Sequence, residues 1–177
     1  MKIEIRNIFW DSFEDLDEWI LWFEKNLNPF PIQMAFLLDN ETLQSVLNTK
    51  QSPFNPVSIF GAYYNNLMIG SFVITHDKED DSAEFTHLIL DGSIHKTYIS
   101  GIVLIEIARY VEIYLKSLQI EYFHTNIPAS SSALRKLLLM FGAEQKATLK
   151  SYQKIKIGNS FTRRDAIYFE KLLNLKK

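Results

Sequence analysis

The spacing of apolar residues changes between two periods along the chain, which predicts a domain of mixed helices and strands. Spacings of three and four between residues 16 and 27 are typical of an amphipathic helix, and alternation elsewhere is typical of half-buried strands. The pattern predicts helices over residues 11–26, 32–48, 98–118 and 130–141. It predicts strands over residues 2–8, 57–64, 67–75, 84–90, 121–125, 146–157 and 164–172.

Turn and breaker residues set the ends of several elements. Asn65 and Asn66 separate two predicted strands, and asparagine tolerates the positive φ that a tight hairpin needs. Pro128 is expected at the start of the helix over 130–141, where its missing N–H costs nothing, and Gly142 is expected to end that helix. The buried stripe of the longest helix is predicted to consist of Leu104, Ile107, Val111, Leu115 and Leu118.

The predicted order is β, α, α, β, β, β, α, β, α, β, β, without an internal repeat, a low-complexity segment or a linker. A chain of 177 residues that is 47% hydrophobic suits one domain, residues 1–177, with a substantial core. We therefore expect an α/β (α+β) fold whose central sheet is mixed and mostly antiparallel, with about seven strands and about four flanking helices.

Composition and charge exclude several classes of protein. The absence of cysteine excludes disulfides, thiolate metal sites and a cysteine nucleophile, and no two of the 4 histidines stand at metal-ligand spacing with a carboxylate, so we expect no metal. A net charge of −2 gives no global attraction to nucleic acid or to an anionic membrane. The N-terminus lacks a signal-peptide pattern and no apolar run approaches membrane-spanning length, so we expect a soluble, cytoplasmic protein.

The stretch from Glu84 to Glu112 carries the clearest functional pattern. A predicted strand over 84–90 meets a turn, Asp91-Gly92-Ser93, and a short polar loop, His95-Lys96-Thr97, leads into a long apolar helix. A strand followed by a loop and a helix N-terminus presents backbone N–H groups to a phosphate. The alternative is an ordinary turn in which Thr97 caps the helix.

These segments resemble the GNAT superfamily of acyltransferases, over most of the chain. Residues 90–101 are similar to the strand end, turn and pyrophosphate loop of that superfamily. Residues 131–143 are similar to the helix that ends in its Gly-Phe signature, and residues 145–172, with Asp165 just before the last strand, are similar to its C-terminal hairpin. The element order and the two N-terminal helices also fit.

The resemblance implies acetyl-coenzyme A, or another acyl-coenzyme A, as the cofactor. In the superfamily, free backbone of one strand pairs with the pantetheine arm, and N–H groups of the loop and helix hold the diphosphate. Carried over to this sequence, the implied cofactor contacts are Leu88, Ile89, Leu90, His95, Lys96, Thr97, Tyr98, Ile99, Ser100, Gly101 and Ser131.

Three positions depart from the superfamily pattern. The middle glycine of the loop is replaced by Tyr98 in one register and by Ile99 in the register shifted by one residue. The Gly-Phe signature is Gly142-Ala143, and the position where many members carry a tyrosine, as the acid that protonates the departing thiolate, is Leu138.

Glu84 and His87 are the candidate catalytic bases. Some members keep a glutamate at the position of Glu84, and an amine must lose a proton before it attacks a thioester. Side-chain alternation predicts Glu84, Thr86, Leu88 and Leu90 on one face of the strand, opposite Phe85, His87 and Ile89. The alternatives are a solvated carboxylate at the strand start for Glu84 and a core or surface histidine for His87.

The function that follows is an N-acyltransferase that moves an acetyl or related acyl group from acyl-coenzyme A to an amine by direct attack in a ternary complex. The partner would be a small-molecule or peptide amine, and the resemblance leaves a homodimer open. The alternative is a non-catalytic GNAT-like module that binds a ligand or a partner, and a further variant uses a longer acyl chain.

Overall fold

The computed structural model describes residues 2–8, 13–26, 30–31, 57–77, 79–94, 97–157 and 160–173. These residues form strands β1 (Glu4–Asn7), β2 (Phe30–Pro31), β3 (Val57–Tyr64), β4 (Leu67–Asp77), β5 (Ser82–Leu90), β6 (Tyr122–Pro128), β7 (Glu144–Ile157) and β8 (Ser160–Leu172). The helices among them are α2 (Phe13–Asn26), α4 (Tyr98–Ser117) and α5 (Ser132–Met140). The helix predicted over residues 32–48 lies outside the described residues.

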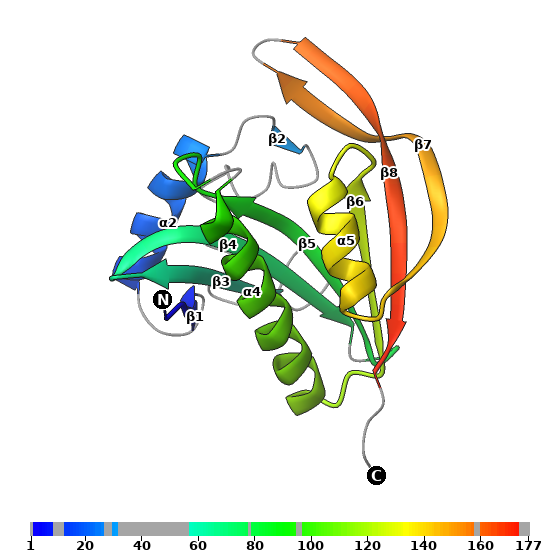
Figure 1. Ribbon diagram of the computed structural model, residues 1–177, viewed down its shortest axis with the longest axis horizontal. Coiled ribbons are helices and arrows are strands. Elements are labelled where there is room, and N and C mark those ends of the chain that lie inside the picture. Colours follow the sequence, from blue (N-terminus) through cyan, green and yellow to red (C-terminus); the bar gives the residue numbers. More distant parts are fainter. Residues whose placement is uncertain are drawn as a thin grey trace.

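The described strands form one sheet in the order β1-β3-β4-β5-β6-β8-β7-β2 (Figure 1). Neighbouring strands are antiparallel except β5 and β6, which are parallel and are connected through α4. The predicted mixed, mostly antiparallel sheet is thus confirmed. It has eight strands among the described residues instead of about seven, because the short β2 pairs with β7 at the edge of the sheet.

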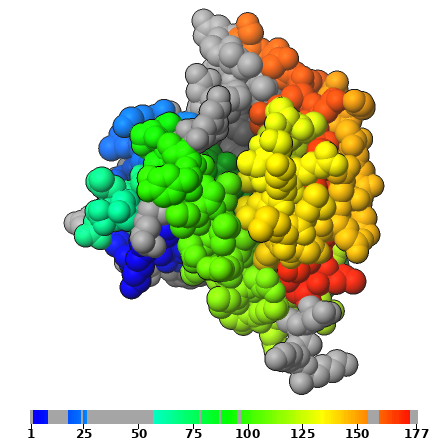
Figure 2. All heavy atoms as spheres, in the orientation of Figure 1, coloured from blue at the N-terminus to red at the C-terminus, as the bar shows by residue number. Residues whose placement is uncertain are grey.

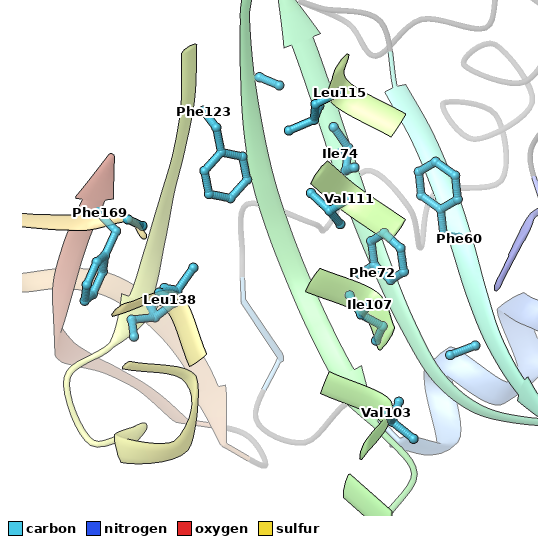
Figure 3. Packing of buried hydrophobic residues seen from close by; sticks show 14 of the residues in the cluster. Phe60, Phe72, Ile74, Val103, Ile107, Val111, Leu115, Phe123, Leu138 and Phe169 are labelled. Atoms are coloured by element: carbon cyan, nitrogen blue, oxygen red, sulfur yellow. The ribbon is translucent and has the colours of Figure 1, made fainter. Parts of the chain in front are cut away.

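Helices α4 and α5 cover one face of the sheet, as Figures 1 and 2 show. The α4 residues Val103, Ile107 and Val111 are buried against β-strand residues such as Phe72 and Ile74 (Figure 3). The predicted stripe is correct for its first four members but wrong for Leu118, which is 40% exposed. Leu118 is the C-cap residue, directly after the last helical residue, Ser117.

Helix α2 covers the opposite face with a second apolar cluster. Trp19 and Phe23 are fully buried against residues of β3 and β4, as their helical spacing predicts. The indole Nε1 of Trp19 donates a 2.7 Å hydrogen bond to Ser71 Oγ, which in turn donates to the carbonyl oxygen of Phe60 at 3.0 Å. These bonds satisfy the buried polar atoms and fix the position of α2 on the sheet.

Local turn signals are confirmed at two places and wrong at one. Asn65 and Asn66 both have positive φ (50° and 61°), as the hairpin requires, and Gly142 follows α5 with φ +81°. Pro128, in contrast, does not start α5. It is the last residue of β6 and pairs with Ala166 of β8, and the helix begins four residues later at Ser132.

Gly142→Ala is expected to lower the free energy of unfolding by about 1 kcal/mol, because a side chain at φ +81° is strained. Urea denaturation measures the change. Gly142→Asn should cost less, since asparagine tolerates this conformation. Gly92→Ala is the matched control, because an added Cβ at that exposed glycine meets no heavy atom within 4 Å. An equal, small effect of the two alanine substitutions would contradict the role assigned to Gly142.

Candidate functional site

Strands β5 and β6 part in the middle of the sheet. Their pairing covers only Ser82–Phe85 opposite Tyr122–Thr125, whereas β5 continues to Leu90 along β4 and β6 continues to Pro128 along β8. At the last paired position, the buried Thr125 hydroxyl donates a 2.7 Å hydrogen bond to the carbonyl oxygen of Phe85. Beyond this point no described strand pairs with the β6-facing edge of residues 86–90, so its backbone groups can bind an extended ligand.

A β-bulge lies in the same part of β5. Ser71 pairs with Ile89 and Val73 pairs with Thr86, so His87 and Leu88 together stand opposite Phe72. The extra residue reverses the side-chain alternation: Phe85, Leu88 and Leu90 pack on the α4 side, and Ile89 packs in the cluster on the α2 side. The predicted faces of β5 are therefore wrong beyond Thr86, because strict alternation does not allow for a bulge.

The N-termini of α4 and α5 lie at the same edge of the sheet (Figure 1). This follows from the parallel pairing, because α4 follows the C-terminal end of β5 and α5 follows that of β6. Neither N-cap residue, Thr97 or Ser131, makes a side-chain capping bond, and neither first turn carries an acidic residue. The Thr97 hydroxyl donates instead to the carbonyl oxygen of Ile94 at 2.7 Å, which leaves the first N–H groups of α4 available to an anion.

Tyr98 and Ile99, the two residues that can take the place of the middle glycine, are not fully buried at the start of α4. Tyr98 is 78% exposed, and Ile99 packs against the apolar cluster beneath the helix. Gly101 is exposed, and an added Cβ would meet no atom within 4 Å, so tertiary packing does not require a glycine there. His95 and Lys96 lie outside the described residues.

An apolar hollow lies between α4 and α5, over the place where β5 and β6 part. Leu138 of α5, at the position of the superfamily tyrosine, lines it together with Leu88 of β5 and Phe123 of β6. All of its lining side chains are apolar: Phe85, Leu88, Ile107, Ala108, Val111, Phe123, Ile127, Leu134, Leu137, Leu138 and Phe141. The hollow therefore offers no protonated group to a departing thiolate.

A polar cluster occupies the opposite face of the same strands. Asn126 Nδ2 donates to Glu84 Oε1 at 3.4 Å, and the hydroxyl oxygens of Tyr122 and Tyr168 lie 2.9 Å apart. The ring of His124 is close to the rings of both tyrosines, with centroid distances of 5.7 and 6.0 Å. We call this group the polar cluster; its members are Glu84, Tyr122, His124, Asn126, Tyr168 and Glu170.

The charges in the polar cluster are fixed by burial and by hydrogen bonds. Burial is the main cause that raises the pKa of Tyr122 and of Tyr168 above its ordinary value, and the Glu170 carboxylate adds to the effect. The hydrogen bond from the Tyr122 phenol is in turn the main cause that lowers the pKa of Glu170, and Tyr168 adds to it. Near neutral pH both phenols therefore keep their protons and Glu170 is ionised.

Sequence reasoning named Glu84 but missed its neighbours in the polar cluster. Alternation places Tyr122, His124 and Asn126 on one face of β6, and this could be read from the sequence. That β6 lies between β5 and β8, which adds Glu84, Tyr168 and Glu170 to that face, depends on the order of strands in the sheet. The side chain of the other candidate base, His87, lies outside the described parts of the structure.

Two further properties concern the described residues only. They contain no group of three or more histidine and acidic side chains suited to a metal ion. None of their helices combines the length and the apolar character that a membrane span requires.

No protein-family model matches the sequence, and no curated protein is significantly similar to it in sequence. Solved structures are similar in fold. A probable acetyltransferase from Staphylococcus epidermidis ATCC 12228 has a TM-score of 0.70 at 17% identity, over 98% of this chain and 100% of that chain. The ribosomal-protein-S5-alanine acetyltransferase from Vibrio fischeri has a TM-score of 0.73 at 13% identity, over 100% and 97% of the two chains.

An acetyltransferase from Bacillus subtilis, solved in complex with CoA, is a more distant match, with a TM-score of 0.55 at 13% identity over 98% of this chain and 99% of that chain. All of these structures are acetyltransferases. The chain therefore has the fold of these acetyltransferases, which is the fold that the resemblance to the GNAT superfamily implies.

Proposed function

We propose that the protein is an N-acyltransferase that transfers an acetyl or related acyl group from acyl-coenzyme A to an amine. The observation that carries the proposal is the parting of β5 and β6 beside two uncapped helix N-termini. The unpaired edge of β5 suits an extended amide-containing arm, and the N–H groups of α4 suit a diphosphate. The CoA complex of the Bacillus subtilis acetyltransferase supports the choice of cofactor.

The chemistry would occur where β5 and β6 part. Backbone N–H groups near Leu90 would polarise the thioester carbonyl, and the amine would attack its carbon atom. A C–N bond forms, the C–S bond breaks, and the amine proton passes to Glu84 directly or through water. Because Leu138 replaces the superfamily tyrosine, water would protonate the thiolate of coenzyme A.

Titration calorimetry of the full chain with acetyl-coenzyme A tests the cofactor. We expect one site per chain with a dissociation constant of about 1–100 μM, a range typical of substrate binding by enzymes. No binding at high micromolar concentration would contradict the proposal. Titration with an eight-carbon acyl-coenzyme A examines the longer-chain variant, for which the apolar hollow beside Leu88 provides suitable surroundings.

A non-catalytic binding module is the second candidate, and the apolar side chain of Leu138 favours it. The two candidates differ in the release of coenzyme A thiol. A panel of polyamines, amino acids, aminoglycosides and peptides should include an acceptor that accelerates thiol release if the protein is an enzyme. Binding of acetyl-coenzyme A without thiol release on any acceptor would favour the binding module.

A further inference from the structure

The polar cluster contains buried polar atoms that lack hydrogen-bond partners within the described part of the chain. Nδ1 of His124 and Oδ1 of Asn126 are buried, and neither has a partner among the described residues. Among the described residues, Glu84 receives one long side-chain hydrogen bond, 3.4 Å, from Asn126. A buried acceptor without a donor costs about 1–3 kcal/mol, so a ligand that supplies N–H donors here would be stabilised.

Glu84, His124 and Asn126 lie on one face at the point where β5 and β6 part; His124 Nδ1 accepts a hydrogen bond when the ring proton is on Nε2. Glu84 and His124 are direct partners in the parallel register, and Asn126 is the next residue of β6 on that face, one position beyond the last pair. A donor group bound there would therefore lie beside the unpaired backbone of β5, which is the edge proposed above to hold the cofactor arm.

The charge of the polar cluster favours a cation. It contains the carboxylates of Glu84 and Glu170, and hydrogen bonds lower the pKa of Glu170. Among the described residues, Lys146 lies beside the cluster, 2.6 Å from Glu144 and 4.0 Å from Glu170, so its charge is already paired. An ammonium group offers three N–H donors and a positive charge, whereas a substrate carboxylate would face two like charges.

We propose that Glu84, His124 and Asn126 form the acceptor subsite, and that it binds the primary ammonium group of an alkylamine with no carboxylate nearby. The inference rests on the proposed function and names its acceptor class. A free diamine and a lysine side chain both carry such a primary ammonium group on an alkyl chain. In a diamine, the second ammonium group would extend across the polar cluster toward Glu170, the other carboxylate of that face.

Calorimetry of the full chain in the presence of coenzyme A tests the subsite with 1,4-diaminobutane, butan-1-amine and 4-aminobutanoate. We expect 1,4-diaminobutane to bind at least about tenfold more tightly than 4-aminobutanoate, because the two differ in the charge of the far end. Nα-acetyl-lysine amide, titrated in parallel, shows whether a lysine side chain is also accepted. Equal affinities for 1,4-diaminobutane and 4-aminobutanoate would overturn the proposal.

Variants of Asn126 give an independent test. Asn126→Leu removes the acceptor at similar volume and should weaken binding of 1,4-diaminobutane about tenfold, whereas Asn126→Asp keeps an acceptor and should retain binding. Glu106→Gln, which breaks an ion pair with Arg109 on the outer side of α4, is the control and should change nothing. Unchanged binding of 1,4-diaminobutane by Asn126→Leu would contradict the proposed subsite.

Acetyl-coenzyme A is titrated into every variant, so that a failure of the proposed transferase function can be distinguished from a failure of the proposed acceptor subsite. If the cofactor binds but the amines are not discriminated, the acceptor subsite is wrong and the cofactor site stands. If the amines are discriminated as expected and the cofactor does not bind, the subsite stands without the transferase function. In an active enzyme, Asn126→Leu should raise the KM for the amine, since it removes an acceptor of the ammonium group.

Discussion

Ser100→Glu is expected to weaken acetyl-coenzyme A binding about 100-fold while making the fold slightly more stable. Ser100 lies in the first turn of α4, where the structure has no acidic residue. A carboxylate in a first turn favours the helix by about 0.3–1 kcal/mol through the helix dipole. The same charge opposes a diphosphate bound to the N–H groups of that turn, by about 3 kcal/mol at close range near a protein surface.

This prediction is specific because Ser100→Glu should change cofactor affinity and fold stability in opposite directions. A substitution that merely damaged the protein would lower the melting temperature and the affinity together. Ile113→Glu adds the same charge to the exposed side of the same helix, about 20 Å further along, and should leave cofactor binding unchanged. Calorimetry and thermal unfolding of both variants are the measurements. Wild-type affinity of Ser100→Glu for acetyl-coenzyme A would place the diphosphate elsewhere.

Glu84→Gln is expected to lower kcat about 100-fold or more with the best acceptor, because glutamine cannot take a proton from the attacking amine. Affinity for acetyl-coenzyme A should stay within about twofold, since Glu84 lies on the face opposite the apolar hollow. Steady-state rates of thiol release measure the effect. Glu106→Gln, on the outer side of α4, is again the matched control.

Raising the pH from 7 to 9 should recover part of the activity that Glu84→Gln loses. An alkylamine has a pKa of about 10, so a larger share of it is already deprotonated at pH 9 and needs no base. Wild-type kcat in Glu84→Gln, or an equal loss in Glu106→Gln, would exclude Glu84 as the base. The solvated carboxylate that the sequence also allows would then be the correct description of Glu84.

Local signals along the sequence were sufficient for most of the fold. Period two and period 3.6 located each described strand and helix from residue 57 onward, because burial of one face imposes these spacings whatever the partner element is. The Asn65-Asn66 hairpin and the end of α5 at Gly142 were also predictable, because positive φ restricts the choice of residue. The start of α4 was predictable as well, because the spacing of apolar residues changes there from period two to period 3.6.

The tertiary structure alone decided what the site contains. The bulge at His87 and Leu88 is absent from the sequence pattern, because it depends on how β5 pairs with β4, and it turns Leu88 toward α4 instead of toward the face of Glu84. The polar cluster likewise requires β6 to lie between β5 and β8. Local chemistry determines which segments are helix or strand, whereas the neighbours of Glu84 come from residues about 40 to 85 positions away, and only the packing of the strands brings them together.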